Sequence, residues 1–83
     1  MLTGFHYVYR LRSLSSPDQV YTGLSDDLEA RLEKHNQGGV PSTTRYTPWC
    51  IESAHAFRDR DKAVAFEAYL KTGSGREFAR RHV

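Results

Sequence analysis

The feature that most constrains this chain is a short β-prone run that gives way, within a few residues, to a helical pattern. The run VYTG has strand character and ends at a glycine. In the helical pattern that follows, DDLEARLEKHN, Leu28 and Leu32 form one apolar stripe, and Arg31 and His35 lie one turn apart at its edge. A guanidinium and an imidazole are therefore directed toward whatever this helix packs against.

The segment before this stretch predicts its packing partner. Residues 6–12 (HYVYRLR) alternate as a strand does, with Tyr7, Tyr9 and Leu11 on one side. The polar loop SLSSPDQ joins this strand to the run that ends at Gly23. We therefore expect an antiparallel hairpin that carries tyrosines against the helix.

A third strand is expected at residues 49–57 (WCIESAHAF), after a hydroxyl-rich loop punctuated by prolines. Strict alternation would place Trp49, Ile51 and Phe57 on the same side of this strand. All of them are apolar, so this side is expected to face the core.

The next segment, AVAFEAYLK, predicts a helix that buries Ala63, Phe66 and Leu70. Glu67 lies within the same arc of the helix. Burying an unpaired carboxylate costs several kcal/mol, so this side chain needs a partner. Two explanations remain open: a structural ion pair with Arg31, or a ligand for a cation at a cleft.

The C-terminal segment predicts one more short helix. Ser74 and Glu77 have the S-x-x-E spacing of a capping box, and Phe78 would anchor the helix that follows. The expected fold is therefore α+β, with a three-stranded antiparallel sheet flanked by about three helices in the order β-β-α-β-α-α. Residues 1–83 are expected to form a single domain.

Length and composition narrow the classes of function. A domain of 83 residues buries too little surface for a deep substrate cavity, so an open surface site is expected. One cysteine, Cys50, excludes an internal disulfide and a multi-cysteine zinc site, which favours a reducing cytoplasm. No apolar run is long enough to span a bilayer, so no membrane association is expected.

The distribution of charge along the chain is more informative about binding partners than the net charge of +2. Cations crowd the last third of the chain, where Lys71 and Arg76 flank the glycine-rich turn, and a loop upstream carries Arg45 and Tyr46 among hydroxyl side chains. Such groups can bind phosphate oxygens, although a solvated charged face and an ordinary surface loop are equally compatible with the pattern. These residues are the candidate nucleic-acid contacts.

At this point the residues resemble a known family, the GIY-YIG nuclease domain. Tyr7-Val8-Tyr9 stands where that family has its first tripeptide, and Tyr21-Thr22-Gly23 stands where it has the second. The likeness covers nearly the whole chain, which is similar to the compact stand-alone bacterial members. The site positions that match the family in order are Tyr9, Tyr21, Arg31, His35 and Glu67.

The resemblance implies metal-dependent hydrolysis of DNA phosphodiester bonds, as in DNA repair or processing. It implies that Tyr9 is the base for the attacking water, that Tyr21 orients the water or the phosphate, and that Arg31 stabilises the transition state. His35 would support the tyrosine hydrogen bonds, and Glu67 would hold Mg²⁺ or Mn²⁺. For Tyr9 to act near neutrality its pKa must fall from about 10, and nearby positive charge is the available cause.

The chain departs from the family pattern at three points: Tyr7 replaces the first glycine, Thr22 replaces the usual aliphatic residue, and no asparagine follows Glu67, although some family nucleases use one there. The missing asparagine and the short chain, without a separate DNA-recognition domain, keep a second function open. A structure-selective or weakly selective endonuclease is therefore the first hypothesis. The alternative is a nucleic-acid-binding or adaptor module that keeps the scaffold without useful catalysis, and a purely structural domain is a weaker third.

Overall fold

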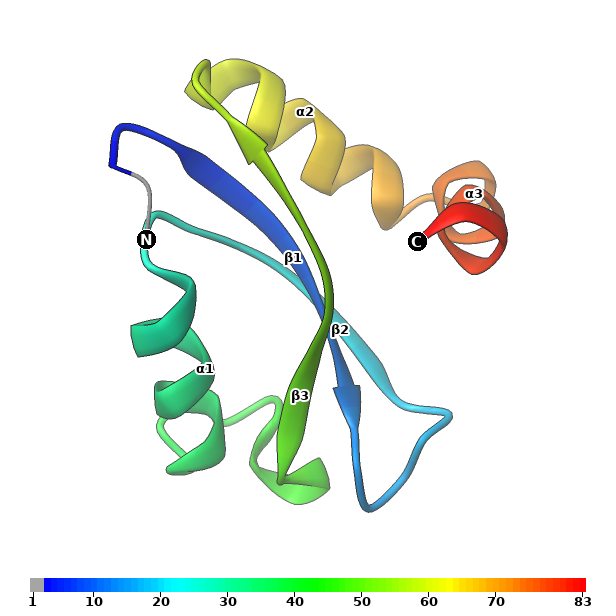
Figure 1. The fold of residues 1–83 in the computed structure, drawn as a ribbon. Coiled ribbons are helices and arrows are strands. Elements are labelled where there is room, and N and C mark those ends of the chain that lie inside the picture. The colour runs from blue at the N-terminus through cyan, green and yellow to red at the C-terminus, as the bar shows by residue number, and fades with distance from the viewer. Residues whose placement is uncertain (1–2) are drawn as a thin grey trace.

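The computed structural model describes residues 3–83 and has the expected architecture, a three-stranded antiparallel sheet with helices on both of its faces (Figure 1). In chain order its elements are β1 (His6–Ser13), β2 (Val20–Ser25), α1 (Leu28–Asn36), the short 3₁₀ helix η1 (Thr44–Tyr46), β3 (Trp49–Phe57), α2 (Arg60–Leu70) and α3 (Gly73–His82). The α+β fold class predicted from the sequence is confirmed.

β1 is the central strand of the sheet, whose order is β2-β1-β3. It pairs with both neighbours in antiparallel register, and Tyr9 lies directly opposite Gly23 of β2. β2 is consequently an edge strand, and one of its long sides has no strand partner among residues 3–83.

The two faces of the sheet carry separate cores, because the alternation of β1 sends successive side chains to opposite sides. Tyr9 and Leu11 pack with Trp49 beneath α1. Val8 packs on the other face with Ala63 and residues of the last two helices. Figure 1 shows this arrangement, with α1 on one side of the twisted sheet and α2 and α3 on the other. The predicted division of β1 into two faces is confirmed.

The predicted division of β3 was wrong, and a β-bulge is the reason. Ile51 pairs with Leu11 and Ser53 pairs with Arg10, so Glu52 is an extra residue on the bulged strand. The bulge reverses the alternation, with the result that Trp49 packs beneath α1 and Phe57 packs on the opposite face.

Side-chain caps fix where the helices begin. Asp27 caps α1 and Asp59 caps α2, each by accepting hydrogen bonds from backbone N–H groups of the first turn. The predicted capping box at Ser74 was wrong: α3 begins at Gly73, and Thr72 Oγ1 accepts from the N–H of Gly75 at 3.0 Å.

The turn between α2 and α3 requires a glycine. A Cβ atom at Gly75 would lie 1.7 Å from the carbonyl oxygen of Tyr69, which is a severe overlap with backbone. Only glycine lets α3 pack this closely on the end of α2. Within residues 3–83, no helix combines the length and the apolar character needed to cross a membrane.

Candidate active site

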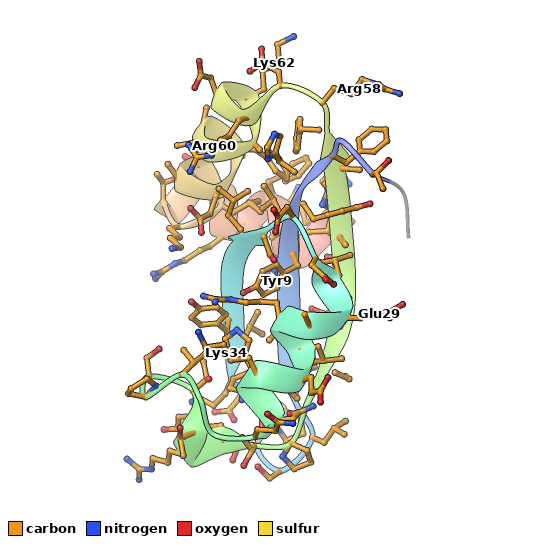
Figure 2. All side chains as sticks on the ribbon, turned by 90° about the vertical axis from the view of Figure 1, so that its left-hand side faces the viewer. Tyr9, Glu29, Lys34, Arg58, Arg60 and Lys62 are labelled. Atoms are coloured by element: carbon orange, nitrogen blue, oxygen red, sulfur yellow. The ribbon has the colours of Figure 1, made fainter. Side chains whose placement is uncertain are left out.

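The hydroxyl group of Tyr9 lies at the centre of a hydrogen-bonded group formed by β1 and α1. It is 3.1 Å from Nε2 of His35 and accepts a hydrogen bond from Nε of Arg31 at 3.3 Å. Arg31 and His35 are one turn apart on α1, so both reach the same phenol. Figure 2 shows Tyr9 near the middle of the face that carries α1. The structure therefore brings these three predicted site residues together.

Tyr21 of β2 adds a second phenol beside this group. Its ring lies 4.8 Å from the His35 ring and 6.3 Å from the Tyr9 ring, measured between centroids. The side chain is half-buried, so part of it remains accessible at the edge of the sheet. The hairpin thus supplies one enclosed and one accessible tyrosine.

Gly23 provides the space that the Tyr9 hydroxyl occupies. A Cβ atom at this position would lie 2.4 Å from Oη of Tyr9 and 3.0 Å from the ring of Tyr21. Real Cβ contacts are not this short, so any side chain at Gly23 would force the Tyr9 phenol to move. The glycine of the second tripeptide is therefore part of the site geometry.

The environment of Tyr9 favours the neutral phenol. Burial is the largest cause and raises its pKa above 10.0, the hydrogen bond from Arg31 lowers it, and the nearby Tyr21 and Glu67 raise it. Arg31 is correspondingly stabilised as a cation, and its pKa is raised chiefly by the hydrogen bond to Tyr9. The charge of Glu67 is thus close enough to act on the phenol.

His35 is fully buried and electrically neutral at neutral pH. Burial, followed by the charges of Arg31 and Lys34, lowers its pKa below 6.5. Its Nδ1 lies 2.7 Å from Oγ1 of Thr43, so both ring nitrogens have partners. A neutral imidazole carries one N–H, which it gives either to Thr43 or to Tyr9.

Thr43 was not among the predicted site residues. The loop that contains it was expected to present hydroxyl groups to phosphate, but Thr43 is 1% exposed and turns inward. Its carbonyl oxygen also accepts the indole N–H of Trp49 at 2.9 Å. No periodicity signals such a contact, because the residue lies in an irregular segment.

Glu67 is half-buried, and its partner is not Arg31. Its carboxylate lies 3.5 Å from Nζ of Lys71, one turn along α2, and its side chain is 23% exposed. That separation is the outer limit of a hydrogen bond, so the carboxylate oxygens retain capacity for another ligand. Residues 3–83 contain no cluster of three or more potential metal ligands. A single accessible carboxylate suits Mg²⁺, which keeps several waters, so the residues present fit such an ion.

The four predicted nucleic-acid contacts fall into two pairs on different faces of the sheet. The Arg45 guanidinium lies 5.5 Å from the centroid of the Tyr46 ring, which packs against the core beneath α1. Lys71 and Arg76 lie on the other face, where they line a cleft of about 420 Å³. The structure does not bring the two pairs together.

A comparison with known proteins identifies the family. Residues 5–80 match the model of the GIY-YIG catalytic domain. A UPF0213 protein of Haloquadratum walsbyi is 32% identical over 72 residues, which cover 86% of this chain and 79% of that protein. A UPF0213 protein of Staphylococcus aureus is 32% identical over 68 residues, which cover 81% and 80%.

A second kind of relative is much longer. The structure-specific endonuclease subunit slx1 of Talaromyces marneffei is 38% identical over 72 residues, which cover 80% of this chain. The match spans only 18% of the slx1 protein. No solved structure matches the chain. The chain belongs to the GIY-YIG catalytic domain family, as the resemblance of its two tripeptides implied.

Proposed function

We propose that this chain is a metal-dependent endonuclease that hydrolyses DNA phosphodiester bonds, structure-selective or weakly selective, and acts in DNA repair or processing. The observation that carries the proposal is the position of the Tyr9 hydroxyl, held between Arg31 and His35 with Glu67 close enough to affect its pKa. Cleavage of a phosphodiester needs a proton acceptor, positive charge at the phosphate and a nucleophilic water, and this group supplies the first two.

Tyr9 takes the proton of the attacking water in this proposal. The phenol first has to give its own proton to solvent, a loss that burial opposes and the Arg31 hydrogen bond favours. Arg31 has a second role, because a guanidinium has five N–H donors and only Nε contacts Tyr9 at 3.3 Å. Its remaining donors stabilise the negative charge that accumulates on the phosphate oxygens. His35 holds the Tyr9 hydroxyl in place.

Glu67 would hold the divalent cation, with Mg²⁺ or Mn²⁺ as the candidates. When bound, such an ion supplies positive charge to the phosphate oxygens and to the neighbourhood of the phenol. For the carboxylate, this means exchanging its weak contact with Lys71 at 3.5 Å for a stronger partner. With its charge compensated in this way, Glu67 would no longer raise the pKa of Tyr9.

Two observations favour the second candidate, a binding module without useful catalysis. In the protein alone the pKa of Tyr9 is raised, and Glu67 is already paired with Lys71. A module of this kind would bind DNA in a salt-dependent manner that neither a chelator nor substitution of Glu67 alters.

The test is a panel of nicked, flapped, branched and linear DNA, incubated with the protein and Mg²⁺ or Mn²⁺. We expect cleavage of at least one member, and we expect it to disappear with EDTA, with Glu67→Gln and with Arg31→Ala. The matched control is Glu29→Gln, because Glu29 is an exposed carboxylate on α1 that points away from Tyr9 in Figure 2. Binding without any cleavage would reject the endonuclease and favour the binding module.

A further inference from the structure

A cleft of about 420 Å³ lies on the face of the sheet opposite α1, between the edge strand β2 and the junction of α2 with α3. Its volume falls within the range of roughly 300–1,000 Å³ that is usual for small-molecule sites. It is therefore larger than a single phosphate requires. The proposed roles of Tyr9, Arg31 and His35 leave this cleft unused.

The cleft is positively charged on one side. Arg10, Lys71 and Arg76 line it, and its lining contains no carboxylate. Arg76 is exposed and makes no ion pair with residues 3–83, so its charge is available to a ligand. Arg10 shares the carboxylate of Glu52 with Arg12, and Lys71 contacts Glu67, so the unpaired charge of Arg76 leaves the cleft positively charged. The ligand is consequently an anion.

Three of the remaining five lining residues are apolar, and Tyr21 and Thr22 complete the lining. Val20 from β2, Leu70 from the end of α2 and Ala79 from α3 supply hydrocarbon surface next to the cations. A bare phosphate would leave that surface in contact with water, whereas a sugar or a base would cover it. A group that is anionic at one end and flat and weakly polar at the other matches both halves, and a nucleotide has this chemistry.

The cleft is joined to the candidate active site at two residues. Tyr21 lines the cleft and also lies 4.8 Å from the ring of His35. Lys71 lines the cleft and also contacts Glu67 at 3.5 Å. The cleft therefore adjoins two residues that contact the candidate active site, Tyr21 beside His35 and Lys71 beside Glu67.

We propose that the cleft receives one unpaired nucleotide of the substrate strand beside the scissile phosphate, with its phosphate at Lys71 and Arg76 and its base or sugar on the apolar side. This inference rests on the proposed function and adds a substrate preference to it. A paired base cannot leave the duplex without losing its stacking and pairing, so DNA with a single-stranded segment next to the cut is preferred.

The experiment compares two DNA substrates of the same sequence, a nicked duplex and the same duplex with a single-stranded flap, in a fluorescence-anisotropy assay without divalent cations. We expect the wild-type protein to bind the flap substrate more tightly. In Arg76→Gln, affinity for the flap is expected to fall about tenfold, while affinity for the nicked duplex changes little. Arg76→Glu should lose more of the preference than Arg76→Gln does.

Lys62→Gln is the matched control, since Lys62 is an exposed cation at the other end of α2, beside Arg58 and Arg60 (Figure 2). It removes the same charge outside the cleft and should leave the preference for the flap intact. Thermal unfolding of each variant checks that the fold is unchanged. The proposal is overturned if the Arg76 variants keep the preference for the flap. It is also overturned if they lower the affinities for the flap and for the nicked duplex by equal factors, no larger than the factor seen with Lys62→Gln.

Competition with a deoxynucleoside monophosphate and with inorganic phosphate shows whether the cleft binds a nucleotide of the DNA strand or only a free small molecule. The proposal requires the mononucleotide to displace the flap more effectively than phosphate does, and Arg76→Gln to weaken both the mononucleotide and the flap. A mononucleotide that binds through Arg76 without affecting the flap would overturn it. Binding is measured without metal, so the binding result can be interpreted even if the wild-type protein does not cleave DNA. Absence of cleavage would reject the proposed function alone.

Discussion

The hydroxyl oxygen of Thr43 lies 2.7 Å from Nδ1 of His35, and both side chains are almost completely buried. His35 in turn lies 3.1 Å from the Tyr9 hydroxyl through its other ring nitrogen. A loop threonine therefore fixes the orientation of the imidazole that holds the central phenol. Thr43 touches no group that would contact a phosphate directly, so under the proposed function it is a positioning residue.

Replacing Thr43 with valine keeps the shape of the side chain and removes its hydroxyl. Nδ1 of His35 would then be buried without a partner, which costs about 1–3 kcal/mol of unfolding free energy. We expect kcat for DNA cleavage to fall about tenfold, which corresponds to about 1.4 kcal/mol, with little change in KM. Denaturant unfolding and steady-state cleavage kinetics measure the two effects.

Two neighbouring variants test whether this result depends on the hydroxyl group. Thr43→Ser keeps the hydroxyl and should retain most of the activity. Thr44→Val removes an adjacent hydroxyl that contacts the carbonyl oxygens of Gly38 and Val40 but not His35, so it should leave kcat unchanged. Equal losses of kcat in Thr43→Val and Thr44→Val would mean that the loop as a whole matters, and that the contact with His35 does not.

Gly23→Ala tests the space that the Tyr9 phenol occupies. The new Cβ would lie 2.4 Å from Oη of Tyr9, so the hydroxyl has to move away from Arg31 and His35. A displacement of about 1 Å at a reacting group can cost about 10²-fold in rate, and the overpacking costs about 1–3 kcal/mol of stability. Cleavage assays and thermal unfolding should show the two losses together.

Gly73→Ala is the control for this glycine substitution. A Cβ at Gly73, the first residue of α3, would have nothing within 4 Å. The change should leave cleavage unchanged and raise stability by about 0.4–1 kcal/mol, because alanine has less freedom in the unfolded chain. Full activity in Gly23→Ala would show that the exact position of the Tyr9 hydroxyl is unimportant.

Much of the fold could be predicted because each element has a simple period. The alternation along β1 assigned Tyr9 and Val8 to opposite faces, and the two cores of the structure follow from it. β3 could not be predicted in the same way, because an extra residue at Glu52 shifts the pairing and an alternating count does not detect it. The bulge is visible only once the strand is paired with β1.

The site was predictable where regular elements carry it, and unpredictable where a loop or a local contact does. The spacing of Arg31 and His35 on one helix placed both against the hairpin, and the structure brings them to Tyr9. Thr43 lies in an irregular segment whose side-chain directions follow from no period. Glu67 was assigned an ion pair with Arg31 as one of two explanations, whereas helix geometry gives it Lys71, four residues later.

The buried imidazole makes stability depend on pH in a specific range. The pKa of His35 is lowered below 6.5 in the folded protein, chiefly by burial, so the unfolded chain binds the proton first as the pH falls. The free energy of unfolding should therefore decrease as the pH falls below 6.5. Denaturant unfolding between about pH 7.5 and 5.5 measures this slope, above most of the range in which Glu52 and Glu77, whose pKa values are lowered below 4.5, contribute.

The substitution His35→Asn should flatten that slope, since it removes the titrating group. The NMR ring signals supply an independent check, because the chain has four histidines and the His35 signal should shift at a lower pH than 6.5. A slope that is the same in His35→Asn and in the wild-type protein would assign the pH dependence to another group.

Arg31 and Glu67 have opposite electrostatic effects on the phenol of Tyr9, and substituting each one separates the two effects. The hydrogen bond from Arg31 lowers the pKa of Tyr9, and the charge of Glu67 raises it. In the metal-free protein, Arg31→Gln should therefore raise the Tyr9 pKa, and Glu67→Gln should lower it. Ultraviolet titration of the phenols, with Tyr9→Phe as the reference among the five tyrosines, measures both shifts.

Both substitutions should lower the rate of DNA cleavage. Arg31→Gln removes the positive charge that lies beside the phenol and that would stabilise the phosphate. A loss of about 10²–10³-fold in kcat is therefore expected. Glu67→Gln should also abolish cleavage, even though it makes the phenol easier to ionise, because a neutral amide is a much weaker ligand for Mg²⁺. If Glu67→Gln were instead as active as the wild-type protein, the carboxylate would act only on the pKa of Tyr9 and the cation would have to bind elsewhere.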